Sequence, residues 1–174
     1  MTTIVAVEEA NAVSMYADSM VGSDQNVVEL EQSKIFEKSG MVIGVAGAVT
    51  VLNHLRHGYL PEPPDDLDGE QADAWVTRVL TPAIRAVVEE TGIQQDQQGL
   101  YGFGLLVIVA GRCYEISSDF GWARTRNGIY TIGTGDNIAL GALAAGASPR
   151  EAVRIAAQYD PYTGHSITKK IVLL

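Results

Sequence analysis

The sequence predicts an α+β fold, a four-layer αββα sandwich in which two antiparallel sheets stack face to face with helices on their outer sides. Segments typical of strands and of helices alternate in blocks along the 174 residues: strands, helices, strands, helices, strand. The helical segments carry apolar stripes, and one strand segment is nearly continuous in apolar residues, as expected for a strand covered on both faces. Stacked layers bury all of these surfaces.

The first block contains four short segments typical of strands. Residues 3–7 and 12–18 are each typical of a short strand, and the polar stretch "EEAN" between them predicts a hairpin turn. Residues 27–36 alternate in their first half, and residues 41–47 follow the turn "KSG". We expect these four segments to form one antiparallel meander.

The next block is helical. Apolar residues Val51, Leu52 and Leu55 indicate a helix after Gly47, and residues 61–71, rich in proline and acid, predict an exposed connection. A long helix is expected over residues 70–91, ended by Gly92 and kinked or divided by Pro82. Its apolar stripe is expected to comprise Trp75, Val79, Ile84, Val87 and Val88.

Strand segments return at residues 101–111, 113–118 and 128–133. Two helices then follow, a small-residue helix within 135–147 and another within 148–159, where Ser148 is the expected N-cap and Pro149 the first helical residue. Residues 166–174 predict a final strand. Without an internal repeat or a linker, residues 1–174 are expected to form one domain.

Composition narrows the class of protein. The formal net charge is −9, which argues against binding nucleic acid, and no apolar run is long enough to span a membrane. The start of the chain has no features of a signal segment. Cys113 is the single cysteine, so no internal disulfide can form. We expect a cytoplasmic protein without nucleic-acid or membrane partners.

The second residue is a threonine, which has a particular chemistry at a chain terminus. If Met1 is removed, as the small Thr2 side chain allows, Thr2 carries a hydroxyl and a free α-amino group. A hydroxyl needs a base within reach to act as a nucleophile. An α-amino group, with a pKa of about 7.7–8.0, can accept a proton near neutrality. Thr2 would therefore be a nucleophile that carries its own base.

Such a site needs further groups, and the sequence offers a candidate for each. A nearby lysine lowers the pKa of the amine and a carboxylate holds the lysine; Asp18 ends "YAD" and Lys34 lies in "SKIF". Backbone N–H groups must stabilise the oxyanion of acyl transfer, and Gly47 closes "GVAG" before a helix. Further on come "GTGD", around Thr134, and "DPYTG", residues 160–164. Each element alone is more typical of an ordinary turn, strand or cap.

Together these elements resemble the proteasome-type N-terminal-nucleophile hydrolases, and HslV peptidases in particular. The similarity lies in the intervals from Thr2 to Asp18 to Lys34, in Ala46–Gly47, in Gly133–Gly135 and in Asp160–Gly164, and it runs from residue 2 to about residue 170. Thr134 and Thr163 stand where many proteasome subunits have serine, and Met1 alone precedes the threonine. The resemblance implies the N-terminal-nucleophile hydrolase fold and amide-bond hydrolysis.

The resemblance also implies roles for the matching residues. The implied set is Thr2 as nucleophile with its amine as base, Lys34 tuning that base, Asp18 pairing with the lysine, Gly47 in the oxyanion hole, and Thr134, Asp160 and Thr163 supporting the amine. The matching pocket for the substrate side chain is lined by Val21, Val45 and Val49, which indicates cleavage after apolar residues. No cofactor is required. Backbone carbonyls at the matching positions could hold Na⁺ or a similar cation: Ala157, Asp160 and Thr163.

The leading hypothesis is a threonine endopeptidase that assembles with copies of itself into rings or stacked rings and degrades peptides or unfolded proteins. The resemblance implies six or seven subunits, and an ATP-dependent unfoldase is a candidate partner. Two alternatives stay open. The chain could be a catalytically silent ring subunit, against which the retention of Thr2, Asp18 and Lys34 argues, or a small-molecule amidase with the same N-terminal chemistry.

Overall fold

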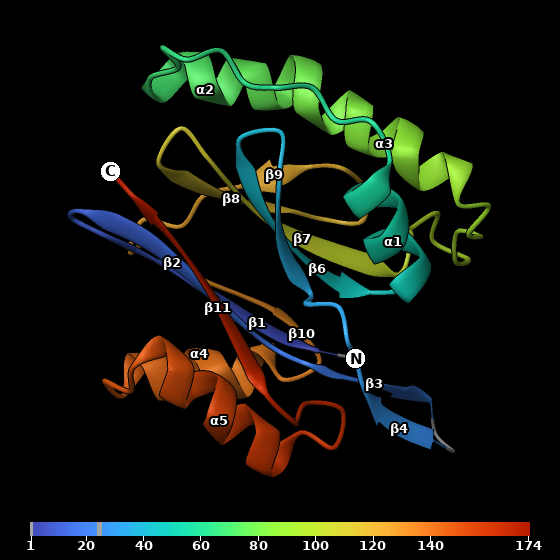
Figure 1. The fold of residues 1–174 in the computed structure, drawn as a ribbon, viewed down its shortest axis with the longest axis vertical. Helices are drawn as coiled ribbons and strands as arrows, with labels where there is room; N and C mark the ends of the chain where they lie inside the picture. The colour runs from blue at the N-terminus through green and yellow to red at the C-terminus, as the bar shows by residue number, and fades with distance from the viewer. Residues whose placement is uncertain (1, 24–25) are drawn as a thin grey trace.

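The computed structural model of the protein describes residues 2–23 and 26–174, and its strands form two antiparallel sheets and a separate hairpin (Figure 1). The four-stranded sheet has the order β10-β1-β2-β11; its strands are β10 (Ile129–Gly133), β1 (Thr3–Glu9), β2 (Ala12–Asp18) and β11 (Ile167–Leu173). The five-stranded sheet has the order β5-β6-β7-β8-β9; its strands are β5 (Ile35–Lys38), β6 (Met41–Gly47), β7 (Phe103–Val109), β8 (Arg112–Ile116) and β9 (Trp122–Ala123). The hairpin pairs β3 (Met20–Ser23) with β4 (Asn26–Glu29).

Helices cover the outer face of each sheet, so the predicted four-layer αββα sandwich is confirmed (Figure 1). The helices over the five-stranded sheet are α1 (Val49–His57), α2 (Gly69–Trp75), a π-helical segment η1 (Val76–Leu80) and α3 (Thr81–Glu90). Those over the four-stranded sheet are α4 (Asp136–Ala144) and α5 (Pro149–Tyr159). A core of buried side chains fills each of the three spaces between layers.

The predicted meander of the first four segments is wrong. β1 and β2 belong to one sheet, β5 and β6 belong to the other, and the 27–36 segment divides into β4 and β5. β4 is exposed along its whole length and pairs with β3, outside both sheets. Alternation over residues 27–30 indicates a strand but does not specify its partner, which is why the sequence pattern failed here.

Pro82 does not divide the long helix, because the helix widens just before it. The Thr81 N–H donates to the Val76 carbonyl five residues back, the π-helical pattern, and α2, η1 and α3 run on without a break. The wide turn shifts the phase of the buried stripe by one residue. Val76 and Leu80 are fully buried, whereas Val79, which was predicted to be in the stripe, is 40% exposed.

The two sheets pack together through side chains of β1, β2, β6, β7 and β10. Several of the predicted site residues lie at the ends of these strands or directly after them. Among the described residues, no helix has both the length and the apolar character needed to cross a bilayer.

Candidate active site

The centre of the site is an ion pair buried inside the protein. Asp18 ends β2 and Lys34 lies just before β5, and the Lys34 Nζ donates to the Asp18 Oδ1 at 2.9 Å. The two side chains are only 1% and 3% exposed. Because a buried charge without partners is costly, an ion pair placed here indicates a specific role or a carefully satisfied network.

Asp18 has such a network. Its Oδ1 also accepts the Thr3 N–H at 2.9 Å, and its Oδ2 accepts the N–H groups of Met20 and Gly164, each at 3.1 Å. The carboxylate therefore connects β1, β3, Lys34 and the loop before β11. These fixed donors leave the Asp18 side chain no freedom to turn away from Lys34.

The ammonium of Lys34 is easier to deprotonate than usual. Burial lowers the pKa of Lys34, and the attraction of Asp18 offsets this lowering only in part. The charge that Lys34 carries when protonated is little exposed to solvent, so it acts strongly on neighbouring groups.

Thr2 lies against the same lysine. It is 2% exposed, and Thr2, Lys34 and Gly47 all line one small cavity. The same cavity is lined by Val21, Val45 and Val49. The chain thus brings the predicted nucleophile, lysine, oxyanion glycine and apolar pocket together in space.

Two glycines let the chain pass closely behind Thr2. Gly133 has φ of +104°, and a Cβ there would lie 2.0 Å from the Thr2 carbonyl oxygen. A Cβ at Gly135 would lie 2.2 Å from the Thr3 Oγ1. Both contacts are too short for any residue but glycine, so the "GTG" stretch holds the start of β1 in place.

Between these glycines, Thr134 connects the Thr2 nitrogen to Asp160. The Thr134 Oγ1 accepts the Thr2 N–H at 3.3 Å and donates to the Asp160 Oδ2 at 2.6 Å. The Thr163 hydroxyl donates to the same oxygen at 2.6 Å. Because the Thr163 proton is used in this way, the Thr3 hydroxyl donates to Thr163, at 2.6 Å. Thr134, Asp160 and Thr163 form one hydrogen-bonded set, and it ends at the Thr2 nitrogen.

This set keeps Asp160 ionised. Burial on its own would raise the pKa of Asp160, but the hydrogen bonds from Thr134, Thr163 and the Tyr162 N–H outweigh it, and the pKa lies below its usual value. An ionised Asp160 is a strong acceptor, so it orients both hydroxyl groups.

Gly47 lies where β6 gives way to α1, and its φ of +110° is in the region that favours glycine. A Cβ there would meet the Gly102 carbonyl oxygen at 2.2 Å. The backbone beside Thr2 is therefore fixed by close packing against the start of β7, as a preorganised oxyanion site requires.

Thr3 belongs to the site but was missed in the sequence. Its N–H and its hydroxyl bond to Asp18 and Thr163, and the residue is fully buried. The doubled threonine at the start of the chain was the available signal. Ser19, Glu29 and Ser166 form a second missed cluster that ties the β3–β4 hairpin to the loop before β11.

The three predicted cation ligands lie at the end of α5 and in the loop after it. Ala157 is in the last turn of α5, and residue 161, whose N–H would bond to its carbonyl, is a proline. The Asp160 carbonyl accepts the Thr163 N–H at 3.2 Å. Hard cations prefer oxygen donors such as backbone carbonyls. No cluster of acidic, histidine or cysteine metal ligands is found among residues 2–23 and 26–174.

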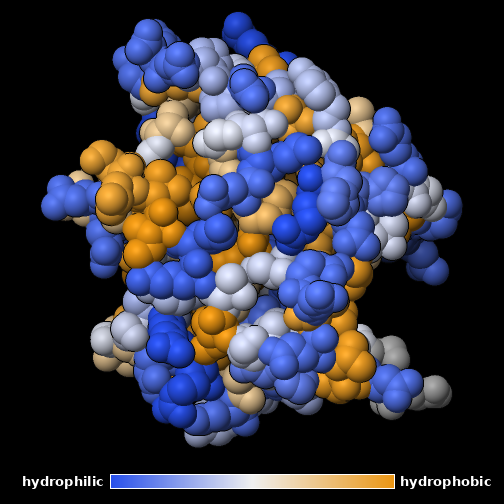
Figure 2. Space-filling model, in the orientation of Figure 1, coloured by the Kyte–Doolittle hydropathy of each residue, from blue (hydrophilic) through white to orange (hydrophobic). Residues whose placement is uncertain are grey.

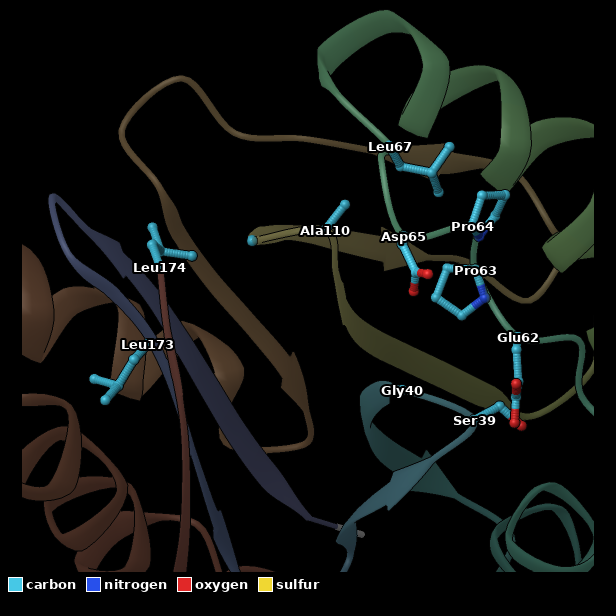
Figure 3. Close-up of a pocket in the computed structure, with 11 residues that line it drawn as sticks. Ser39, Gly40, Glu62, Pro63, Pro64, Asp65, Leu67, Ala110, Leu173 and Leu174 are labelled. Carbon is cyan, nitrogen blue, oxygen red and sulfur yellow. The ribbon is translucent and has the colours of Figure 1, made fainter.

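A larger cavity, of about 710 Å³, lies elsewhere and contains none of the predicted site residues (Figure 3). It is framed by Ser39 and Gly40 of the β5–β6 turn, by the acidic loop from Glu62 to Leu67, and by the exposed Leu173 and Leu174. The Ser39 hydroxyl is already engaged, because it donates to the Leu60 carbonyl at 2.9 Å. Size alone therefore does not identify the reactive site.

Solved structures with the same architecture are found across the whole chain. The chain is similar to Thiobacillus denitrificans BPH in complex with epoxomicin (TM-score 0.78, 18% identity, 99% of this chain and 98% of that one). A second BPH structure from the same organism has a TM-score of 0.76, 19% identity and the same coverage. Eukaryotic HslV from Trypanosoma brucei has a TM-score of 0.69 and 21% identity, with 99% of both chains covered. No family model and no curated protein matches the sequence.

These likenesses define the class of fold: the chain has the N-terminal-nucleophile hydrolase fold. Within that class it has the HslV-like form, over nearly its full length. At these identities the likeness establishes the fold, so the activity has to be argued from the residues of this chain.

Proposed function

We propose that the protein is a threonine-type endopeptidase in which Thr2, freed by removal of Met1, is the nucleophile. Met1 lies outside the described residues. The observation that carries the proposal is the buried Lys34–Asp18 pair, which adjoins the same cavity as Thr2 and Gly47. A site without function has no physical reason to keep a desolvated lysine and carboxylate at this position.

The proposed reaction begins with proton transfer from the Thr2 hydroxyl to the Thr2 amine. The Lys34 ammonium keeps that amine unprotonated by like-charge repulsion, and Thr134 orients it. The Thr2 oxygen then attacks the substrate carbonyl, and the Gly47 N–H donates a hydrogen bond to the negatively charged oxygen that forms. The protonated amine gives its proton to the leaving nitrogen, and water hydrolyses the resulting ester by the same route.

The apolar lining of the cavity sets the proposed preference. Val21, Val45 and Val49 offer no charge or hydrogen-bond donor to a substrate side chain. Peptides with leucine or a similar apolar residue before the cleaved bond should therefore react fastest. A panel of fluorogenic peptides tests this, and a preference for lysine or glutamate at that position would contradict it.

The test of the nucleophile combines two measurements. Mass spectrometry of the native protein should find Thr2 as the first residue, and Thr2→Ala should abolish peptide hydrolysis and labelling by an epoxyketone. Thr2→Ser, which keeps a hydroxyl and an amine, is the matched control and should retain activity. Full activity of Thr2→Ala would overturn the proposal.

We also propose that the enzyme works as a closed ring of its own copies, acting in the cytoplasm on peptides or unfolded proteins, with an ATP-dependent unfoldase as a candidate partner. Negative-stain images should show rings of six or seven subunits. The silent-subunit alternative predicts rings that no epoxyketone labels, and the amidase alternative predicts a labelled protein that is not a ring. Thermal stability in Na⁺, compared with a bulky organic cation, tests the carbonyl site of Ala157, Asp160 and Thr163.

A further inference from the structure

A second cavity, of about 400 Å³, adjoins the site on the other side of Gly47. Gly47 lines both this cavity and the small one that contains Thr2. Gly133 and Thr134 also line the second cavity, as do Glu115 on β8 and Asp136 at the start of α4. A peptide bound with its reactive carbonyl at Gly47 could thus extend into both cavities.

The second cavity lies on the side of the departing half of the substrate. This follows from the proposed function, in which the Thr2 amine must be close to the leaving nitrogen to protonate it. The Thr2 nitrogen is bonded to Thr134, and Thr134 lines the second cavity but not the first. The acyl half then occupies the valine-lined cavity, and the first residues of the leaving half enter the second one.

Glu115 has an unusual position for a charged residue. β8 alternates, and Glu115 shares the face of Cys113, which packs into the core between the two sheets. Glu115 is half-buried, and among the described residues it forms no ion pair. Burial and the nearby Asp136 raise the pKa of Glu115. A carboxylate in this setting is stabilised when a cation arrives.

Asp136 adds to the negative potential of the cavity but has a structural reason to be there. It is the first residue of α4, where a carboxylate interacts favourably with the helix dipole. Among the described residues that line the cavity, none is a lysine, an arginine or a histidine. Glu115 lies within β8 and not at a helix start, so the helix dipole does not explain its position. The charged side chains that line the cavity, Glu115 and Asp136, are both acidic.

We propose that Glu115, supported by Asp136, selects substrates with lysine or arginine in the first positions after the cleaved bond. The proposal rests on the proposed function for the direction of the peptide. It adds a second determinant, on the leaving half, to the apolar preference on the acyl half. Polypeptides with an apolar residue followed by a basic one would be cleaved preferentially.

The test uses internally quenched peptides that share leucine before the cleaved bond and carry lysine, alanine or glutamate after it. Wild-type protein should cleave the lysine peptide faster than the glutamate peptide by roughly fivefold or more, a ratio that should fall at high salt. Glu115→Gln should bring the ratio close to one. Glu90→Gln, at the exposed end of α3, is the matched control and should leave it unchanged.

Two further readouts separate this inference from the proposed function. A leucyl-aminomethylcoumarin peptide has no residue after the cleaved bond, so its cleavage by wild type measures the proposed function alone; if wild type does not cleave it, the proposed function fails. Binding of fluorescent lysine and glutamate peptides to Thr2→Ala needs no hydrolysis. Tighter binding of the lysine peptide, lost on adding Glu115→Gln, supports the inference, and equal binding of both peptides overturns it.

Discussion

At the scale of single residues, Lys34 stands out among the charged side chains. Of the ion pairs formed within the described residues, Lys34–Asp18 is the one in which both partners are almost fully buried, whereas the others are at least one-fifth exposed. Breaking a buried pair leaves an uncompensated charge inside the protein. Stability and catalysis should therefore depend on the same side chain.

We expect Lys34→Met to destabilise the protein by about 3–5 kcal/mol, because Asp18 keeps its charge without its partner. Lys170→Met is a matched control, since Lys170 pairs with Glu37 at the surface, and it should cost about 1 kcal/mol or less. Urea unfolding measures both. Hydrolysis measured where Lys34→Met is still folded should fall by about 10²-fold or more. Equal stability of the two variants would contradict the buried pair.

The lowered pKa of Asp160 predicts how the stability of the protein changes in acid. Its pKa is lowered in the folded protein, so its charge contributes stability above the unfolded value of 3.8, and this contribution is lost as pH falls through the lower folded value. Asp160→Asn should lower stability at neutral pH by about 1–3 kcal/mol. It should also flatten the loss of stability below pH 3.8, measured by unfolding at a series of pH values. Asp66→Asn, in the exposed loop, should change neither.

The sequence indicated which residues of the candidate site lie together, because they follow one another at regular intervals along the chain. Thr2, Asp18 and Lys34 have residue types and intervals that indicate a nucleophile, a carboxylate and a lysine together. The role of Thr3 was not visible, since it depends on contacts with Thr163 and with the backbone at Gly135, more than 130 residues away. No local pattern reports such a contact.

At the scale of elements, several strands and the capped helix α5 were predicted closely. β2 spans the predicted residues 12–18, and Ser148 caps α5 by accepting the Glu151 N–H at 3.3 Å. β3 and the two-residue β9 were missed, because strands this short show no period. The helix around Pro82 was expected to be kinked or divided, and it is not divided, because the inserted π turn accommodates the proline, which propensity alone does not reveal.

The junction between β10 and α4 offers a test of backbone packing at this scale. Gly135→Ala would place a methyl group against the Thr3 and Thr163 hydroxyls, and we expect it to abolish hydrolysis and lower the melting temperature. Gly141→Ala is the matched control within α4, because a Cβ there meets no atom within 4 Å. It should stabilise the protein by about 0.5–1 kcal/mol, as alanine favours a helix interior. Normal activity of Gly135→Ala would contradict the close approach.

At the scale of the whole molecule, two pairs of consecutive large apolar residues are exposed among the described residues. Val27 and Val28, on the projecting β3–β4 hairpin, are 51% and 55% exposed, and Leu173 and Leu174 are exposed at the end of β11. Figure 2 shows apolar colour at both places, beside the hairpin and near the C-terminal end. Exposed apolar surface of this kind is typical of contact with another protein molecule.

If the protein forms the proposed ring, the hairpin is a candidate contact between copies. The double variant Val27→Lys and Val28→Lys should then shift the mass measured by light scattering toward that of the 18.6 kDa chain. Val79→Lys, on the exposed side of the long helix, is the control and should leave the assembly intact. A ring unchanged by the hairpin variant would assign the contact to another surface.

The bonds of Asp18 have a consequence for biosynthesis. Gly164, whose N–H Asp18 accepts, lies 146 residues further along the chain, and the hydroxyl pair of Thr3 and Thr163 spans 160 residues. Until residues 163 and 164 have been synthesised, the chain therefore lacks these two hydrogen-bond partners of its first two strands. If the protein is the proposed peptidase, it should become active only after synthesis is nearly complete, and truncated products should be harmless to the proteins made beside them.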